Sequence, residues 1–291
     1  AHHSDMPLVR PGQASLHELT SWSSLSLDFV IIGADSCGTT SLHHNLAEHP
    51  QIKFTTLRED QFFLGEMSLR VLPFKIQIDT FNQKRDSSRL LGMCNPMLFG
   101  DKIARVRLAM VPNLLVIGIA CDPLGRLEKL FMQHHHCGYS GWKMSNPCHN
   151  NTASLLDISN FVQNKYMRIA ENFVEVKALF GPRLLLLHQA HLRITPKRVF
   201  NLVLSFLGMQ RSFRSKTRFH RYNHVSGYRT DMCKNASMVR RLRRFFEPDY
   251  QLLEKLFEGM VPSELAWRKT RCDRTIDLMA NRTSCTGRTR C

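Results

Sequence analysis

Several features are missing from this chain of 291 residues, and their absence sets the first expectations. No apolar run within it approaches the length of a membrane-spanning helix, and its first residues do not have the pattern of a signal peptide. No CxxC pair is present, and the histidine run 134–136 has no matching cluster of ligands, so we expect no metal site. Acidic residues are few, because 24 Asp and Glu stand against 40 Lys and Arg. The resulting formal net charge of +16 favours anionic partners such as nucleotides, glycans, nucleic acid or acidic membranes, and it does not choose among them.

The composition predicts one sizeable folded unit. Hydrophobic residues make up 43% of the chain, which is enough for a proper core. We expect an N-terminal arm or linker over residues 1–27, one domain over residues 28–262 and a basic C-terminal tail over residues 263–291. We expect contact with a membrane only through a segment that is absent from this chain.

The cysteines and glycosylation signals bear on the compartment. The nine cysteines are an odd number, and Cys137 and Cys148 bracket a loop where they could form a disulfide. Cys37 and Cys121 stand at the ends of predicted strands, and we expect them to be reduced thiols. Three N-x-[ST] sequons favour a secretory lumen over the cytoplasm, which stays open as the alternative; they begin at Asn150, Asn235 and Asn281.

The most informative stretch runs from Leu27 to Leu42. Its apolar, β-branched residues 29–32 predict a buried strand of a parallel sheet, which stops at Gly33. A short turn follows, and a helix opens at Gly38 and continues to Ala47. Free backbone N–H groups at a helix start favour an anion, and glycines let the backbone approach it closely. The stretch therefore predicts a phosphate site, with an ordinary strand–turn–helix as the alternative.

Further strands and helices are expected on both sides of this stretch. The helix at 101–110 carries Ile103, Val106 and Ala109 at helical spacing, with Arg105 and Arg107 expected to point outward. The other expected strands are 51–56, 114–120 and 183–188, and the other expected helices are 123–133, 155–180, 196–208 and 238–256.

The glycine loop resembles that of sulfotransferases that use 3′-phosphoadenosine-5′-phosphosulfate (PAPS), whose loop reads roughly G-x-x-K-x-G-T-T-S-L. The chain follows this pattern from Gly33 to Leu42, except that Ser36 replaces the family lysine, which stabilises charge on the sulfuryl group and the leaving phosphate. A Walker-type P-loop is a poorer match, because Thr39 stands where its lysine must be. The resemblance implies a catalytic position for Ser36 and cofactor binding by Ser36, Cys37, Gly38, Thr39, Thr40 and Ser41.

Two later segments resemble the same family. The segment from Arg58 to Phe63 is similar to a K-E-x-x-F-F motif, which implies that Glu59 is a general base, with a surface carboxylate as the alternative. Cys121 to Arg126 resembles R-D-P-x-x-R, in which the first arginine and a serine eight residues later hold the 3′-phosphate. Here Cys121 and Lys129 occupy those two positions. Lys129 offers a point charge without the fork of an arginine, or it is simply a solvated helix residue.

The C-terminal third continues the resemblance. A basic stretch precedes a turn from Asn223 to Tyr228 that resembles the family loop closing over the nucleotide, which implies cofactor contacts from His224 and Tyr228. The segment from Met238 to Leu256 is similar to the family's terminal L-x-x-F-F-x-P helix, with an apolar face and an arginine-rich face.

Together these matches imply an α/β fold of three layers: a P-loop-like central parallel sheet with helices on both faces and a nucleotide at the carboxyl ends of its strands. They imply a transferase that moves a sulfuryl group from PAPS to a hydroxyl or amine of an acceptor, a carbohydrate in the Golgi or secretory lumen. Since Ser36 carries no charge, another cation must act at the sulfuryl group, either Lys129 or an arginine within 211–221.

Other functions remain open at this stage. A catalytically impaired protein of the same fold would bind an anionic glycan or nucleotide without transfer, and the loss of the loop lysine and of the 3′-phosphate arginine favours it. We expect no nucleic-acid partner, because no DNA- or RNA-binding motif accompanies the positive charge.

Overall fold

The computed structural model describes residues 23–56, 82, 84, 89–135, 168–209, 219 and 235–258. Its centre is a five-stranded sheet with the order β2-β3-β1-β4-β5, in which every neighbouring pair is parallel. The strands are β1 (Phe29–Gly33), β2 (Ile52–Phe54), β3 (Leu90–Cys94), β4 (Leu115–Ala120) and β5 (Leu184–His188). The predicted α/β class with a parallel sheet is therefore confirmed.

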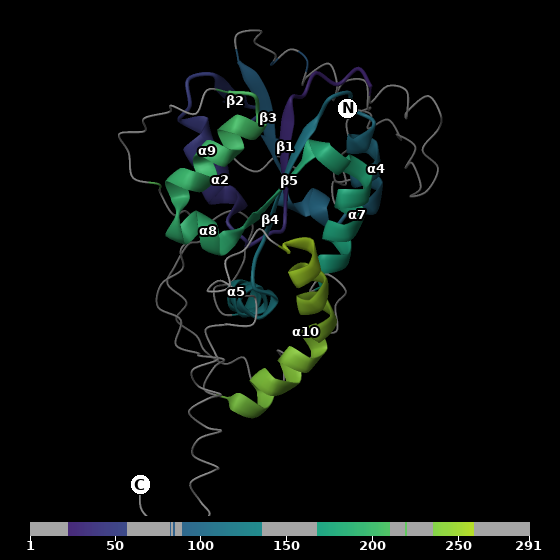
Figure 1. Cartoon of the computed structure of the whole chain (residues 1–291), viewed down its shortest axis with the longest axis vertical. Coiled ribbons are helices and arrows are strands. Elements are labelled where there is room, and N and C mark those ends of the chain that lie inside the picture. The colour runs from purple at the N-terminus through teal and green to yellow at the C-terminus, as the bar shows by residue number, and fades with distance from the viewer. Residues whose placement is uncertain are drawn as a thin grey trace, which may run out of the picture.

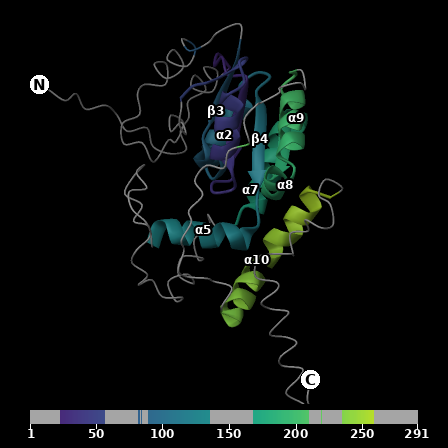
Figure 2. The same cartoon turned by 90° about the vertical axis from the view of Figure 1, so that its left-hand side faces the viewer.

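Helices cover both faces of the sheet (Figure 1). In that view α2 (Thr39–Ala47), α8 (Gln189–Ile194) and α9 (Pro196–Phe206) lie on one side, while α4 (Lys102–Ala109) and α7 (Ala170–Phe180) lie on the other. The helices α5 (Pro123–His135) and α10 (Ala236–Leu256) lie beyond the carboxyl end of the sheet, as Figures 1 and 2 both show. Two short 3-10 turns, η1 (Pro96–Phe99) and η3 (Gly181–Arg183), complete the described elements.

The central strand β1 forms the middle of the core. Residues 29–32 are completely buried, as expected of a strand with helices over both of its faces. Gly33, at its end, has a φ of +124°, and a Cβ there would lie 2.7 Å from Cβ of Phe99 and 2.8 Å from the carbonyl oxygen of Pro96. Close packing of η1 against the strand end therefore requires a glycine at this position.

The orientation predicted for α4 is wrong. Ile103 and Val106 are 39% and 40% exposed, whereas Arg105 is only 2% exposed. The guanidinium of Arg105 donates to the carbonyl oxygen of Phe99 and pairs with the carboxylate of Glu175 in α7. Burial of this arginine is tolerated because both contacts replace hydrogen bonds to water.

Most of the remaining elements were predicted from the sequence, and one strand was not. The expected strands at 51–56, 114–120 and 183–188 are present, and so are helices at each expected position that the structure describes. No strand was expected at β3, whose Gly92 lies against the ring of Phe29. The arm at residues 1–22, the tail at 263–291 and the first part of the helix expected at 155–180 lie outside the described residues. Within the described part of the chain, no helix is long and apolar enough to span a bilayer.

Candidate anion-binding site

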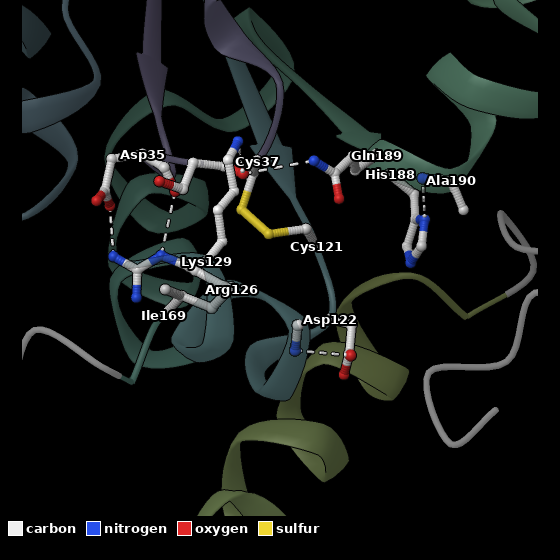
Figure 3. The surroundings of a disulfide bond; sticks show 12 residues. Asp35, Cys37, Cys121, Asp122, Arg126, Lys129, Ile169, His188, Gln189 and Ala190 are labelled. Carbon is white, nitrogen blue, oxygen red and sulfur yellow. Dashed lines mark hydrogen bonds and ion pairs between the residues drawn. A yellow bond between two sulfur atoms is a disulfide. The ribbon is translucent and has the colours of Figure 1, made fainter. Parts of the chain in front are cut away.

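The site lies where β1, β4 and β5 end side by side (Figure 3). In a parallel sheet with helices on both faces, this carboxyl edge is where ligands bind. The loop after β1 contains two residues with positive φ, Ser36 at 60° and Gly38 at 105°. Gly38 is the N-cap of α2, no side chain caps that helix end, and its first turn contains no acidic residue. The helix start is thus compatible with an anion.

A disulfide joins Cys37 in this loop to Cys121 at the end of β4. The expectation that both cysteines are reduced thiols is therefore wrong. The two Cα atoms are 5.3 Å apart, because β1 and β4 are hydrogen-bonded neighbours whose ends meet at the same edge. Both side chains are buried, at 0% and 2% exposure, so the disulfide lies in the core at the base of the loop.

Two donors from different elements converge on one carbonyl of the loop. The ammonium nitrogen of Lys129, in α5, lies 3.2 Å from the carbonyl oxygen of Ser36. The side-chain amide nitrogen of Gln189, the first residue of α8, lies 3.4 Å from the same oxygen (Figure 3). Lys129 therefore brings a positive charge to Ser36, the residue that stands in place of the lysine of the motif that the loop resembles. From the sequence, Lys129 was identified as a candidate site residue, but Gln189 was missed. The one feature that could have indicated Gln189 is its position directly after a predicted buried strand.

Arg126 connects the same helix to the loop a second time. Its Nε donates to the carbonyl oxygen of Asp35 at 3.2 Å, and its Nη2 forms an ion pair with the Asp35 carboxylate. The side chain of Arg126 is 4% exposed and that of Asp35 is 30% exposed. The charge of this guanidinium is therefore largely offset by a residue of the protein itself.

Asp122 organises the start of α5. Its Oδ2 accepts a hydrogen bond of 2.9 Å from the backbone N–H of Gly125, which caps the helix, and Pro123 occupies the first helical position. Its Oδ1 accepts from the hydroxyl of Tyr250 in α10. Burial raises the pKa of Asp122, and the hydrogen bond from Tyr250 acts in the opposite direction. Burial and the neighbouring Asp122 raise the pKa of Tyr250, which keeps the phenol as the donor.

His188 ends β5 beside this region. Its Nδ1 accepts a hydrogen bond of 3.0 Å from the backbone N–H of Ala190 and so caps α8. Burial, followed by the nearby His191, lowers the pKa of His188 to about 4. The ring is therefore neutral near pH 7.

The structure brings most of the sequence-predicted residues together at this edge: Ser36, Cys37, Gly38, Thr39, Thr40, Ser41, Cys121 and Lys129. Glu59, His224 and Tyr228 lie outside the described residues, and so do the arginines at 211–221 and the pair Cys137 and Cys148. Among the residues that are described, no group of three or more His, Cys, Asp or Glu side chains is placed to hold a metal ion.

The fold resembles that of a known sulfotransferase. No protein-family model matches the chain, and no curated protein sequence matches it either. The crystal structure of a sulfotransferase from Alicyclobacillus acidocaldarius superimposes with a TM-score of 0.61 at 18% identity, over 84% of this chain and 99% of that one. The α/β fold, with its five-stranded parallel sheet and flanking helices, is therefore sulfotransferase-like.

Two further structures match with lower scores. The sulfotransferase domain of the Synechococcus PCC 7002 olefin synthase gives a TM-score of 0.40 at 17% identity, over 63% of this chain and 73% of that one. The mouse sulfotransferase SULT7A1, solved in complex with PAP, gives 0.38 at 12% identity, over 94% of this chain and 84% of that one.

Proposed function

We propose that the protein binds PAPS at the β1–α2 loop and transfers its sulfuryl group to a hydroxyl or amine of an acceptor, a carbohydrate. The observation that carries the proposal is the placement of the Lys129 ammonium 3.2 Å from the carbonyl oxygen of Ser36. A loop that lacks its lysine then still has a cation beside the position of the transferring group. A charged donor at such a position accounts for a factor on the order of a hundred or more in rate.

The other residues of the loop fit an anionic phosphosulfate. The α2 start has no side-chain cap and no acidic residue in its first turn, so its backbone N–H groups are suited to a phosphate. In this proposal the N–H groups at residues 38–41 hold the 5′-phosphate, and the Ser36 hydroxyl donates to the sulfuryl oxygens. Lys129 offsets the charge that develops as the bond from sulfur to the phosphate oxygen breaks and the bond to the acceptor forms.

Two roles in the proposal come from the sequence resemblance. Glu59 accepts the proton of the attacking hydroxyl or amine, and His224 and Tyr228 close over the nucleotide. The carbohydrate acceptor is likewise suggested by the segment from Arg58 to Phe63.

A second function has its own supporting observations. Cys121 takes part in a disulfide, and Arg126 is paired with Asp35. Cys121 therefore carries no charge, and the charge of Arg126 is offset by Asp35, so neither residue is suited to bind the 3′-phosphate of the nucleotide. These contacts favour a protein of the same fold that binds an anionic nucleotide or glycan without transferring a group.

One experiment separates the two functions. Calorimetry with 3′-phosphoadenosine-5′-phosphate (PAP) measures binding, and incubation with radiolabelled PAPS and a panel of carbohydrate, phenol and amine acceptors measures transfer. We expect micromolar PAP binding that falls at least about tenfold in Lys129→Met. The matched control is Lys102→Met, which removes an exposed lysine from α4. Binding without transfer to any acceptor would favour the second function, and no PAP binding would overturn the first.

We also propose that the protein resides in the secretory lumen. The Cys37–Cys121 disulfide supports this, because structural disulfides persist in oxidising compartments and are rare in the cytosol. The three sequons are compatible with the same location.

A further inference from the structure

The helix that carries both loop-contacting cations depends on a distant helix for its position. Arg126 and Lys129 lie one turn apart on α5, and both reach the β1–α2 loop. Among the described elements, α5 packs mainly against α10, and it extends past the end of the sheet (Figure 2). Among the described elements the sheet contacts α5 little, so the direction of α5 depends on its N-terminal connection to β4, on α10 and on the Arg126 contacts with Asp35.

One series of hydrogen bonds makes the first two of these connections. Asp122 follows directly after Cys121, caps the first turn of α5 by accepting from Gly125 N–H, and accepts a hydrogen bond from the hydroxyl of Tyr250. Tyr250 is 3% exposed and belongs to α10. The adjacent residue, Asp249, accepts from the backbone N–H groups of Ile169 and Ala170 at 3.2 and 2.8 Å, which fixes α10 to the start of α7. Tyr250 thus lies between an anchored segment of α10 and the cap of α5.

We propose that Tyr250 is a positioning residue, which holds the Asp122 carboxylate and, through α5, places the Lys129 ammonium at the Ser36 carbonyl. The inference rests on the proposed function, because the Lys129 ammonium is positioned at the site proposed to bind the phosphosulfate. Removal of the phenol oxygen leaves one carboxylate oxygen of Asp122 without this donor and loosens the cap. The start of α5 then shifts, and Lys129, two turns further along, leaves the loop.

The first test needs no nucleotide. In the full chain, amine acetylation by an N-hydroxysuccinimide ester is followed over time by peptide mass spectrometry, with the exposed Lys102 as an internal reference. We expect Tyr250→Phe to raise the labelling rate of Lys129 about threefold or more relative to Lys102, because the ammonium is released from its carbonyl partner. The control for general loosening is Glu175→Gln, which weakens the Arg105 contact between α4 and α7 and should leave the Lys129 rate unchanged.

The second test is a double-mutant cycle on PAP affinity. We expect Tyr250→Phe to weaken binding by roughly tenfold in the wild-type background and to have no effect in the Lys129→Met background. Equal losses in both backgrounds would mean that the phenol acts through overall stability, which would overturn the proposal. If Tyr250→Phe does not fold, Asp122→Asn replaces it, since the amide oxygen can still accept from Gly125 while the amide NH2 group, which cannot accept the bond from the phenol, faces Tyr250.

The two tests fail independently. An unchanged Lys129 labelling rate in a folded Tyr250→Phe protein overturns the positioning role. Absent PAP binding in the wild-type protein overturns the proposed function, and the labelling result still decides whether Tyr250 places Lys129.

Discussion

Asp35 and Arg126, which are 91 residues apart in the sequence, form an ion pair that joins the β1–α2 loop to α5. The pair places a carboxylate of the protein in the same loop that is proposed to bind an anion. An anionic ligand at the proposed site would lie near this negative charge, and Arg126 would be only partly available to it.

Replacement of this carboxylate should strengthen anion binding. We expect Asp35→Asn to raise PAP affinity by about threefold to tenfold, because it removes a negative charge near the ligand and releases Arg126. Calorimetry at two salt concentrations measures the difference in PAP affinity between variant and wild type. This difference should be smaller at the higher salt concentration. The same variant should lower the free energy of unfolding, since it removes the ion pair between the Asp35 carboxylate and a buried guanidinium. Weaker PAP binding by Asp35→Asn would show that the ion pair preserves the loop geometry instead of competing with the ligand.

The Cys37–Cys121 disulfide should contribute strongly to stability. It closes a segment of 84 residues, for which chain-entropy arguments give roughly 4 to 5 kcal/mol. We expect the double variant Cys37→Ser/Cys121→Ser to melt well below the oxidised wild type, by differential scanning calorimetry. Addition of a phosphine reductant should lower the wild-type melting temperature toward that of the variant, and any shift in the variant itself measures other disulfides. Identical melting temperatures for oxidised wild type and variant would contradict this role.

Gly33 and Gly208 offer a matched pair of glycine substitutions. Both have positive φ, at +124° and +72°, but a Cβ at Gly33 would overlap Phe99 and Pro96, whereas a Cβ at Gly208 meets nothing within 4 Å. We expect Gly208→Ala to cost about 1 kcal/mol from backbone strain alone. Gly33→Ala should cost at least about 3 kcal/mol, since it adds overpacking in the core. Equal costs in urea denaturation would mean that η1 moves away freely from the end of β1.

His43 should make the fold sensitive to mild acid. Burial, followed by the nearby His44, lowers the pKa of His43 from 6.5 to about 4. Between pH 6.5 and 4, His43 is therefore protonated in the unfolded chain and neutral in the folded protein. The free energy of unfolding falls as the pH drops through this interval. We expect His43 to account for about 2 kcal/mol of the loss between pH 7 and pH 5. Urea denaturation of His43→Gln should show a smaller loss over this interval, and an unchanged loss would exclude His43 as a cause.

Asn235 should carry an N-glycan if the protein passes through the secretory pathway. It is half-exposed, Ser237 of the same sequon is exposed, and only its Oδ1 is needed for the hydrogen bond of 3.0 Å from Met238 N–H that caps α10. A glycan on Nδ2 therefore leaves the cap intact. Secreted expression in eukaryotic cells should give a protein whose Asn235 peptide changes mass on glycosidase treatment. Asn235→Asp keeps a capping oxygen and removes the acceptor, so it should lose this change without losing stability.

Periodicity and hydrophobic runs predicted the central part of the fold. β1, β4 and β5 are short, nearly continuous apolar segments, a pattern typical of strands in a parallel sheet that is covered on both faces. β3 escaped notice because Gly92 and Cys94 give it no β-branched character, and its place is fixed by packing against Phe29. The inward position of Arg105 could not be foreseen, because it depends on Glu175, a residue of another helix 70 positions away.

The sequence predicted which loop forms the candidate site, but it did not predict the side-chain contacts that this loop makes. The residue types from Gly33 to Ser41 predicted a strand, a glycine turn and a helix start, all of which are present, and anion binding there stays a prediction. The sequence could also mark Lys129 as an unusual cation, but not the partner that it reaches, which depends on how α5 leaves the sheet. The pairing of Cys37 with Cys121 was missed for the same reason, because it follows from the adjacency of β1 and β4 and not from any cysteine spacing.

The disulfide also changes what a single break in the chain would do. The covalent ring from Cys37 to Cys121 includes α2, β2, β3, η1, α4 and β4, while β1 and the remaining described elements lie outside it. A cut anywhere between residues 38 and 120 would open this ring without separating the two pieces. The halves of the sheet, and both sides of the candidate site, would stay joined as one molecule until the disulfide was reduced.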